Sequence, residues 1–90
     1  MQTEEILEAV RRIGVKYQVK EMILFGSRAK GTATPRSDFD IAVSGASDFD
    51  ALEECIDEIP TLHSFDIVNL DTCKNDLLVK EIREYGRKIL

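Results

Sequence analysis

The chain has 90 residues, of which 43% are hydrophobic and 32% charged, so it can form one small globular domain and no more. Its formal net charge of -5 argues against a protein that follows nucleic acid along its phosphates, because such binding needs clustered Lys and Arg side chains. No apolar run approaches the ~20 residues that span a bilayer, and the first residues are acidic rather than basic. We therefore expect a cytoplasmic chain with neither a membrane nor a direct nucleic-acid partner.

The first half of the chain is predicted to contain a helix and a buried strand. Thr3 is a candidate N-cap of the helix, and Gly14 is a plausible end for it. Residues 15–20 fit either the end of this helix or a strand, and the pattern does not decide between them. The apolar run at 22–25, bounded by Gly26, predicts a strand that is buried on both faces.

The second half continues the alternation of strands and helices. The sequence Ser-Asp-Phe-Asp occurs twice, and the second copy is interpreted as a helix start with Ser47 as N-cap and Asp50 at the third helical position, in a helix that Pro60 closes. Further elements are predicted as strands at 39–43 and 64–70, a helix from about Asn75 to Gly86, and a short edge strand within 87–90. The pattern predicts a single α/β (α+β) domain over residues 1–90, with a short mixed β-sheet packed against helices.

The cysteines and the histidine do not form a recognisable site in the sequence. Cys55 and Cys73 lack metal-ligand spacing, and in a chain with intracellular character they are expected to be reduced thiols in the core. No pattern around His63 suggests a catalytic triad, so we expect this residue on the surface or at the start of a strand.

Gly26 and Ser27 form the outline of a phosphate site. Glycine lets the backbone turn sharply and approach a ligand directly after a buried strand. Ser27 then offers a hydroxyl and an amide at the start of what reads as a short helix. Taken alone, the same pattern also describes an ordinary turn.

Asp38 and Asp40 are two residues apart on a predicted strand, so their side chains point to the same face. Two carboxylates held this close repel each other, and a divalent cation between them relieves the repulsion. Mg2+ suits such a pair because it takes oxygen ligands and keeps water and substrate phosphates in its shell. The alternative is a strand face that simply meets solvent.

Asp66 interrupts the apolar run of the third predicted strand, where a lone acid is costly unless it is paired or binds a metal. If the second and third strands are neighbours, Asp66 can join Asp38 and Asp40 in a three-carboxylate site for two metal ions. The alternatives are that Asp66 lies on a strand edge and faces water, or that Asp71 is the third carboxylate.

Gly26-Ser27, ten further residues and then Asp38-Phe39-Asp40 resemble the signature of the nucleotidyltransferase superfamily that includes DNA polymerase beta. The stretch at 24–31 is more narrowly similar to the minimal nucleotidyltransferases, small prokaryotic proteins often encoded beside a HEPN-domain partner. The similarity extends over residues 22–70 and implies the nucleotidyltransferase fold. It also implies phosphate contacts by the Gly-Ser pair, two Mg2+ ions on the paired aspartates and a third acid that completes the site, with these roles falling on Gly26, Ser27, Asp38, Asp40 and Asp66.

The resemblance further implies a reaction and a partner. Such a protein acts as an antitoxin by transferring AMP from ATP to a tyrosine of a HEPN ribonuclease toxin. Larger family members hold the acceptor with a second domain, and we expect this chain to have no residues left to build one. Two alternatives stay open: a catalytically idle module that binds nucleotide or masks the toxin, and a small transferase for a soluble acceptor such as an antibiotic. The roles of Arg28, Lys30 and Arg36 are not assigned.

Overall fold

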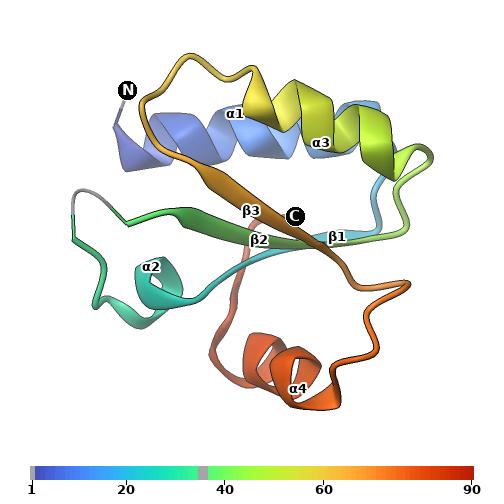
Figure 1. The fold of residues 1–90 in the computed structure, drawn as a ribbon. Helices are drawn as coiled ribbons and strands as arrows, with labels where there is room; N and C mark the ends of the chain where they lie inside the picture. The colour runs from blue at the N-terminus through green and yellow to red at the C-terminus, as the bar shows by residue number, and fades with distance from the viewer. Residues whose placement is uncertain (1, 35–36) are drawn as a thin grey trace.

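The computed structural model describes residues 2–34 and 37–90 (Figure 1). In chain order its elements are α1 (Thr3–Lys16), β1 (Glu21–Phe25), α2 (Ser27–Lys30), β2 (Phe39–Ser44), α3 (Phe49–Asp57), β3 (Phe65–Asn69), α4 (Asp76–Tyr85) and β4 (Arg87–Lys88). Within those residues, no helix has the length and apolar character that crossing a membrane requires. Arg36, to which the sequence assigned no role, lies outside the described residues.

The strands form one mixed sheet in the order β3-β2-β1-β4. β1 runs antiparallel to both β2 and β4, whereas β2 and β3 run parallel. Parallel neighbours need a crossover connection, and α3 supplies it between β2 and β3. The predicted mixed sheet is therefore confirmed, and so is the edge strand near the end of the chain, which is β4.

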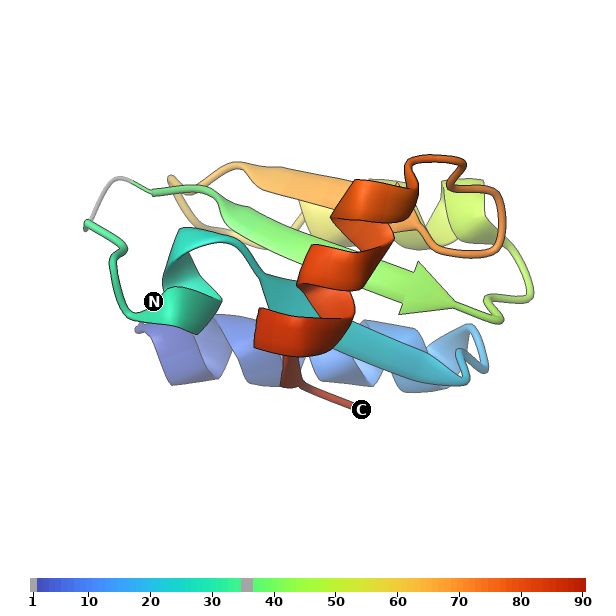
Figure 2. The same ribbon diagram turned by 90° about the horizontal axis from the view of Figure 1, so that it is seen from below.

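Helices cover both faces of this sheet. Figure 1 shows α1 and α3 on one face and α2 and α4 on the other, and Figure 2 shows the molecule from the α2–α4 side. The larger core lies under α1 and α3 and includes Phe39, Ile41 and Val43 of β2. Ala42 belongs to the smaller core under α4. Because successive side chains of a strand alternate between faces, Asp40 also points to the α2–α4 side.

The start of α1 differs from the prediction by one residue. Gln2 is the N-cap, and its backbone N–H donates to the side chain of Glu5 at 3.2 Å. Thr3 is the first helical residue and does not cap the helix. The glutamate at the third helical position thus accepts from the N–H of the N-cap residue, as in a capping box.

The end of α1 lies beyond Gly14, which does not terminate the helix. Gly14 is buried, and a Cβ atom at this position would collide with the sulfur of Met22 on β1. The glycine is therefore a close-packing position between helix and sheet. The chain turns at Gln18, which has a φ of +59°. Residues 15–20, which the sequence left undecided, are the last part of the helix and the turn into β1.

The cap of α3 also lies one residue later than predicted. The side chain of Asp48, rather than that of Ser47, accepts a hydrogen bond from the backbone N–H of Ala51 at 3.1 Å. The helix ends at Asp57, before Pro60. Ser, Asp and Asn are comparably good caps, so the residue type could not distinguish the two neighbouring candidates.

Cys55 and Cys73 are free thiols, but neither lies in the core as predicted. Leu52 and Ile56 occupy the buried side of α3, and this leaves Cys55 half-buried at its margin. The sulfur of Cys55 lies 3.3 Å from the hydroxyl of Tyr17 there. Cys73 lies between β3 and α4 and is also half-buried.

Leu52→Ala is expected to lower the free energy of unfolding by about 2–5 kcal/mol, because it leaves a cavity in the larger core. The matched control is Leu62→Ala, since Leu62 is fully exposed and its truncation should change stability by less than about 0.5 kcal/mol. Urea denaturation followed by circular dichroism measures both values. Equal losses in the two variants would contradict the position of the core.

Candidate active site

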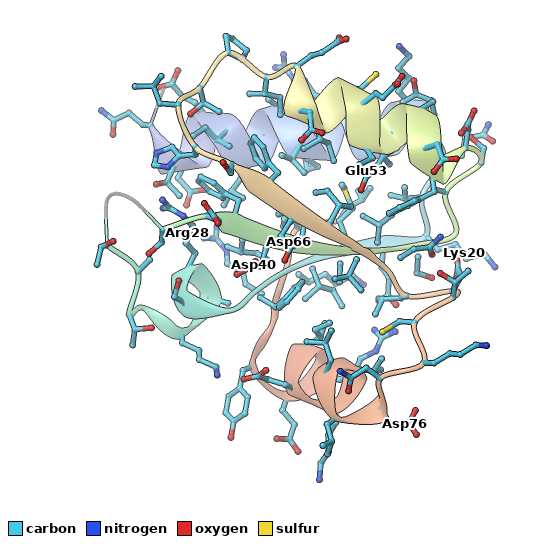
Figure 3. The ribbon with its side chains drawn as sticks, in the orientation of Figure 1. Lys20, Arg28, Asp40, Glu53, Asp66 and Asp76 are labelled. Carbon is cyan, nitrogen blue, oxygen red and sulfur yellow. The ribbon has the colours of Figure 1, made fainter. Side chains whose placement is uncertain are left out.

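The pairing of β2 with its two neighbours brings the acidic residues and the glycine turn together. In the parallel pairing with β3, Asp40 lies opposite Asp66. In the antiparallel pairing with β1, Asp40 lies opposite Phe25, the residue before Gly26. Figure 3 shows the side chains of Asp40 and Asp66 close to one another, with Arg28 near the start of β2. The condition that the second and third strands are neighbours is therefore confirmed.

The electrostatics of Asp40 show that these carboxylates are crowded. Partial burial raises the pKa of Asp40 above its ordinary value, and the negative charges of Asp66 and Asp38 raise it further. Asp38 and Asp66 are exposed, whereas Asp40 is half-buried. Asp38 lies one residue before β2 and not within the strand as predicted. The structure thus places Asp38 and Asp66 near enough to Asp40, at the starts of β2 and β3, for their charges to act on it.

Gly26 occupies a position that other residues would not tolerate. Its φ of +72° and ψ of -153° fall where backbone with a side chain is strained. A Cβ atom here would also collide with the carboxylate of Asp40. Ser27 follows as the first residue of α2, so the predicted strand, turn and short helix are all present. The glycine therefore allows the turn to pass directly against the acidic cluster.

Asp71, the other candidate for the third carboxylate, is at the opposite end of β2. Its side chain accepts hydrogen bonds from the backbone N–H of Gly45 at 2.8 Å and from the hydroxyl of Ser44 at 3.3 Å. These contacts close the loop after β2. The structure therefore groups Asp66, and not Asp71, with Asp38 and Asp40.

Arg28 and Lys30, which the sequence could not assign, point from α2 in different directions. The guanidinium of Arg28 donates to the backbone carbonyl of Ser37. The ammonium of Lys30 pairs with Glu81 on α4 and lies 5.2 Å from the ring centre of Tyr85. The sequence carried no signal for either contact, because the partners of Lys30 are about fifty positions away and the acceptor for Arg28 is a backbone atom.

The donor set at the acidic cluster fits a divalent cation. Asp38, Asp40 and Asp66 offer only carboxylate oxygens, which are the ligands that Mg2+ prefers. Burial and then the negative charges of Asp66 and Asp38 raise the pKa of Asp40, and a bound cation would relieve the repulsion between these charges. Within residues 2–34 and 37–90, no three His, Cys, Asp or Glu side chains are close enough to hold an ion by themselves.

Comparison with known proteins identifies the family. The family model described as "Nucleotidyltransferase domain" matches residues 3–89, so the chain belongs to this family. The resemblance inferred from the Gly-Ser and Asp-Phe-Asp spacing is thereby confirmed.

Among curated proteins, the chain is similar to one from Methanocaldococcus jannaschii named "Putative protein adenylyltransferase MJ0604". The two are 47% identical over 47 residues, which are 50% of this chain and 47% of that relative. The chain thus matches about half the length of this relative.

Among solved structures, the chain is similar to a toxin–antitoxin with AMP-PNP, with a TM-score of 0.76 at 22% identity. The match covers 93% of this chain and 72% of the chain in that structure. A mutant of the toxin–antitoxin MntA-HpeT has a TM-score of 0.74 at 20% identity, with the same coverage. At these identities the likeness shows a shared fold, which confirms the predicted nucleotidyltransferase fold.

Gly26→Ala is expected to destabilise the chain more than Gly31→Ala. Both glycines have positive φ, but a Cβ at Gly31 has no neighbour within 4 Å among the described residues, so that variant carries only the left-handed backbone cost of about 1–2 kcal/mol. The variant at Gly26 adds the collision with Asp40. Denaturant unfolding measures the difference, and the carboxyl carbon signal of Asp40 should shift only in Gly26→Ala. Equal losses with an unchanged Asp40 signal would contradict the contact.

Asp40→Asn is expected to raise the melting temperature of the nucleotide-free chain at neutral pH. Folding raises the pKa of Asp40, so the charged carboxylate opposes folding at every pH above the raised value. This opposition disappears as the pH falls through the raised pKa to below the ordinary value of about 3.9. Calorimetry should therefore find the gain at pH 7 and lose it in acid. Asp71→Asn is the control, because Asp71 accepts hydrogen bonds in the fold and its loss should give no gain.

Proposed function

We propose that the chain is a Mg2+-dependent adenylyltransferase that moves AMP from ATP to a tyrosine of a HEPN-domain toxin. The observation that carries the proposal is that Asp40 lies directly against the Gly26 turn and opposite Asp66, with the charges of Asp66 and Asp38 acting on it. A nucleotide triphosphate has several negative charges, and an acidic cluster can bind it only through cations. Carboxylates beside a glycine turn therefore favour metal-assisted phosphoryl chemistry over simple anion binding.

The names of similar proteins favour a protein acceptor. The Methanocaldococcus jannaschii relative is named as a protein adenylyltransferase, and the similar solved structures are toxin–antitoxin complexes, one of them with AMP-PNP. The ATP analogue AMP-PNP, named for a toxin–antitoxin structure that shares this fold, supports ATP as the nucleotide. A toxin partner supports the antitoxin role. The HEPN class of the toxin and the tyrosine acceptor come from the resemblance of the 24–31 segment to minimal nucleotidyltransferases.

Each residue of the cluster has a proposed role that follows from its position. Gly26 brings backbone close to the site, and Ser27 offers its N–H and hydroxyl to the phosphates at the start of α2. Asp38 and Asp40 would hold two Mg2+ ions, and Asp66 would complete the set from β3. When bound, such ions neutralise the triphosphate and stabilise the charge that develops on its oxygens.

Asp66 is proposed to take the proton in the transfer step. The acceptor oxygen forms a bond to the α-phosphorus, the bond from that phosphorus to the bridging oxygen of the β-phosphate breaks, and pyrophosphate leaves. The tyrosine hydroxyl must lose its proton in this step. Asp66 is exposed on the edge strand β3, so its carboxylate can meet an incoming side chain, whereas Asp40 is half-buried.

Intact-mass analysis tests the reaction directly. The chain is incubated with ATP, Mg2+ and the HEPN-domain protein encoded beside it, and the HEPN protein should gain the mass of AMP. Asp66→Asn should slow this transfer at least ~100-fold, because general-base catalysis contributes that much or more. The same variant should keep the rise in melting temperature that ATP and Mg2+ cause together, since that rise reports binding.

Asp71→Asn is the matched control, because it replaces an exposed aspartate at the other end of β2 and should transfer AMP at the parent rate. A HEPN protein with unchanged mass would exclude the transfer. Transfer at the parent rate by Asp66→Asn would exclude Asp66 as the base. Stabilisation by ATP without any divalent ion would exclude the metal role of Asp38 and Asp40.

A further inference from the structure

One guanidinium contacts the residues on both sides of Asp38. The Nε and Nη2 atoms of Arg28 both donate to the backbone carbonyl oxygen of Ser37, at 3.1 and 2.7 Å. The guanidinium carbon also lies 4.0 Å from the ring centre of Phe39, which is a close cation–π contact. Ser37 immediately precedes Asp38 and Phe39 immediately follows it. Arg28 thus holds the backbone before Asp38 and the side chain after it.

The same guanidinium reaches the start of β3. Its Nη2 atom lies 3.3 Å from Nδ1 of His63, which is located just before β3 as the sequence predicted. Arginine has only donors, so Nδ1 is the acceptor and the ring proton of a neutral His63 is on Nε2. The ring of His63 packs edge-on against Phe39 at 5.3 Å. Arg28 therefore ties α2 to the starts of the two strands that supply the acidic cluster.

Asp38 needs such a restraint more than the other two acids do. Asp40 and Asp66 lie within paired strands, whereas Asp38 precedes β2 and is exposed. Asp38 is only two residues from Asp40, and carboxylates held this close repel each other. Without a contact that fixes the chain at Ser37, this repulsion would favour movement of Asp38 away from the site.

We propose that Arg28 is a positioning residue that fixes Asp38 in the carboxylate cluster through Ser37 and Phe39. Its planar fork makes two parallel hydrogen bonds and stacks on a ring at the same time, which the ammonium of lysine cannot do. The proposal rests on the proposed function in one respect, because Asp38 matters for turnover only if it binds the metal. Its structural part, the restraint on Asp38, holds independently of the reaction.

Arg28→Lys is the central variant, since it keeps the charge and most of the stem. In the nucleotide-free chain, the NMR order parameter of the Asp38 amide should fall from about 0.85, typical of rigid backbone, to below about 0.6. The Mg2+ concentration that gives half-maximal AMP transfer should rise about tenfold, in line with the loss of a residue that orients a metal ligand. The melting temperature should change little, so loss of folded protein would not explain either effect.

Arg83→Lys is the matched control. Arg83 also joins two elements, by an ion pair of 2.7 Å with Glu21, but it is remote in the sheet from the acidic cluster. This variant should leave the order parameter of Asp38 and the Mg2+ requirement at the parent values. Effects of equal size in Arg83→Lys and Arg28→Lys would overturn the proposal, because they would indicate a general response to losing a guanidinium.

A measurement on the parent chain covers the case in which Arg28→Lys fails to fold. The Nε–H proton of Arg28 should exchange with water at least tenfold more slowly than that of Arg12, whose side chain is 78% exposed. Equal exchange rates would overturn the proposal. An unchanged order parameter of the Asp38 amide in a folded Arg28→Lys variant would also overturn the proposal. Absence of AMP transfer in the parent would instead remove the proposed function and leave the order-parameter test intact.

Discussion

The register between β2 and β3 places two carboxylates, Asp40 and Asp66, directly opposite each other in neighbouring parallel strands. Like charges in such a pair are unfavourable, and the negative charge of Asp66 adds to the effect of burial in raising the pKa of Asp40. A register shifted by one residue would turn Ile41 and Val43 out of the larger core, so the apolar face of β2 keeps the acids together. Apolar packing on one face of the sheet therefore keeps Asp40 and Asp66 side by side on the other face, although their charges repel.

The two faces of the sheet accordingly differ in function: one holds the larger core and the other carries the acidic residues. α1 and α3 cover the larger core, which includes Leu52 and Ile56 and provides most of the buried apolar surface. α2 and α4 lie on the other face with a smaller core (Figures 1 and 2), and the alternation of β2 directs Asp40 to this face as well. The ion pair between Lys30 and Glu81 connects these two helices. The site can thus carry unfavourable charge because the energy that stabilises the fold comes mainly from the opposite face.

Local patterns were reliable for element type and less so for element ends. The apolar run before Gly26 correctly indicated a strand, because a strand buried on both faces is apolar throughout. The alternation around Asp40 also indicated a strand, because a strand with one apolar face has a period of two. The caps of α1 and α3 were each misplaced by one residue, since neighbouring Gln, Thr, Ser and Asp side chains can all accept a hydrogen bond from a helix start. Gly14 was wrongly interpreted as a helix end. A glycine stands there because a side chain would collide with the sulfur of Met22, which lies on another element.

The sequence by itself determined the local half of the site, namely the turn at Gly26 and Ser27 and the closely spaced Asp38 and Asp40, because these residues act through neighbours along the chain. Only the tertiary structure could decide between Asp66 and Asp71, since the choice depends on which end of β2 each approaches. It also decided the contacts of Arg28, whose partners include a carbonyl nine residues away and a histidine thirty-five residues away. Strand order and register, which no short motif encodes, bring such distant groups together.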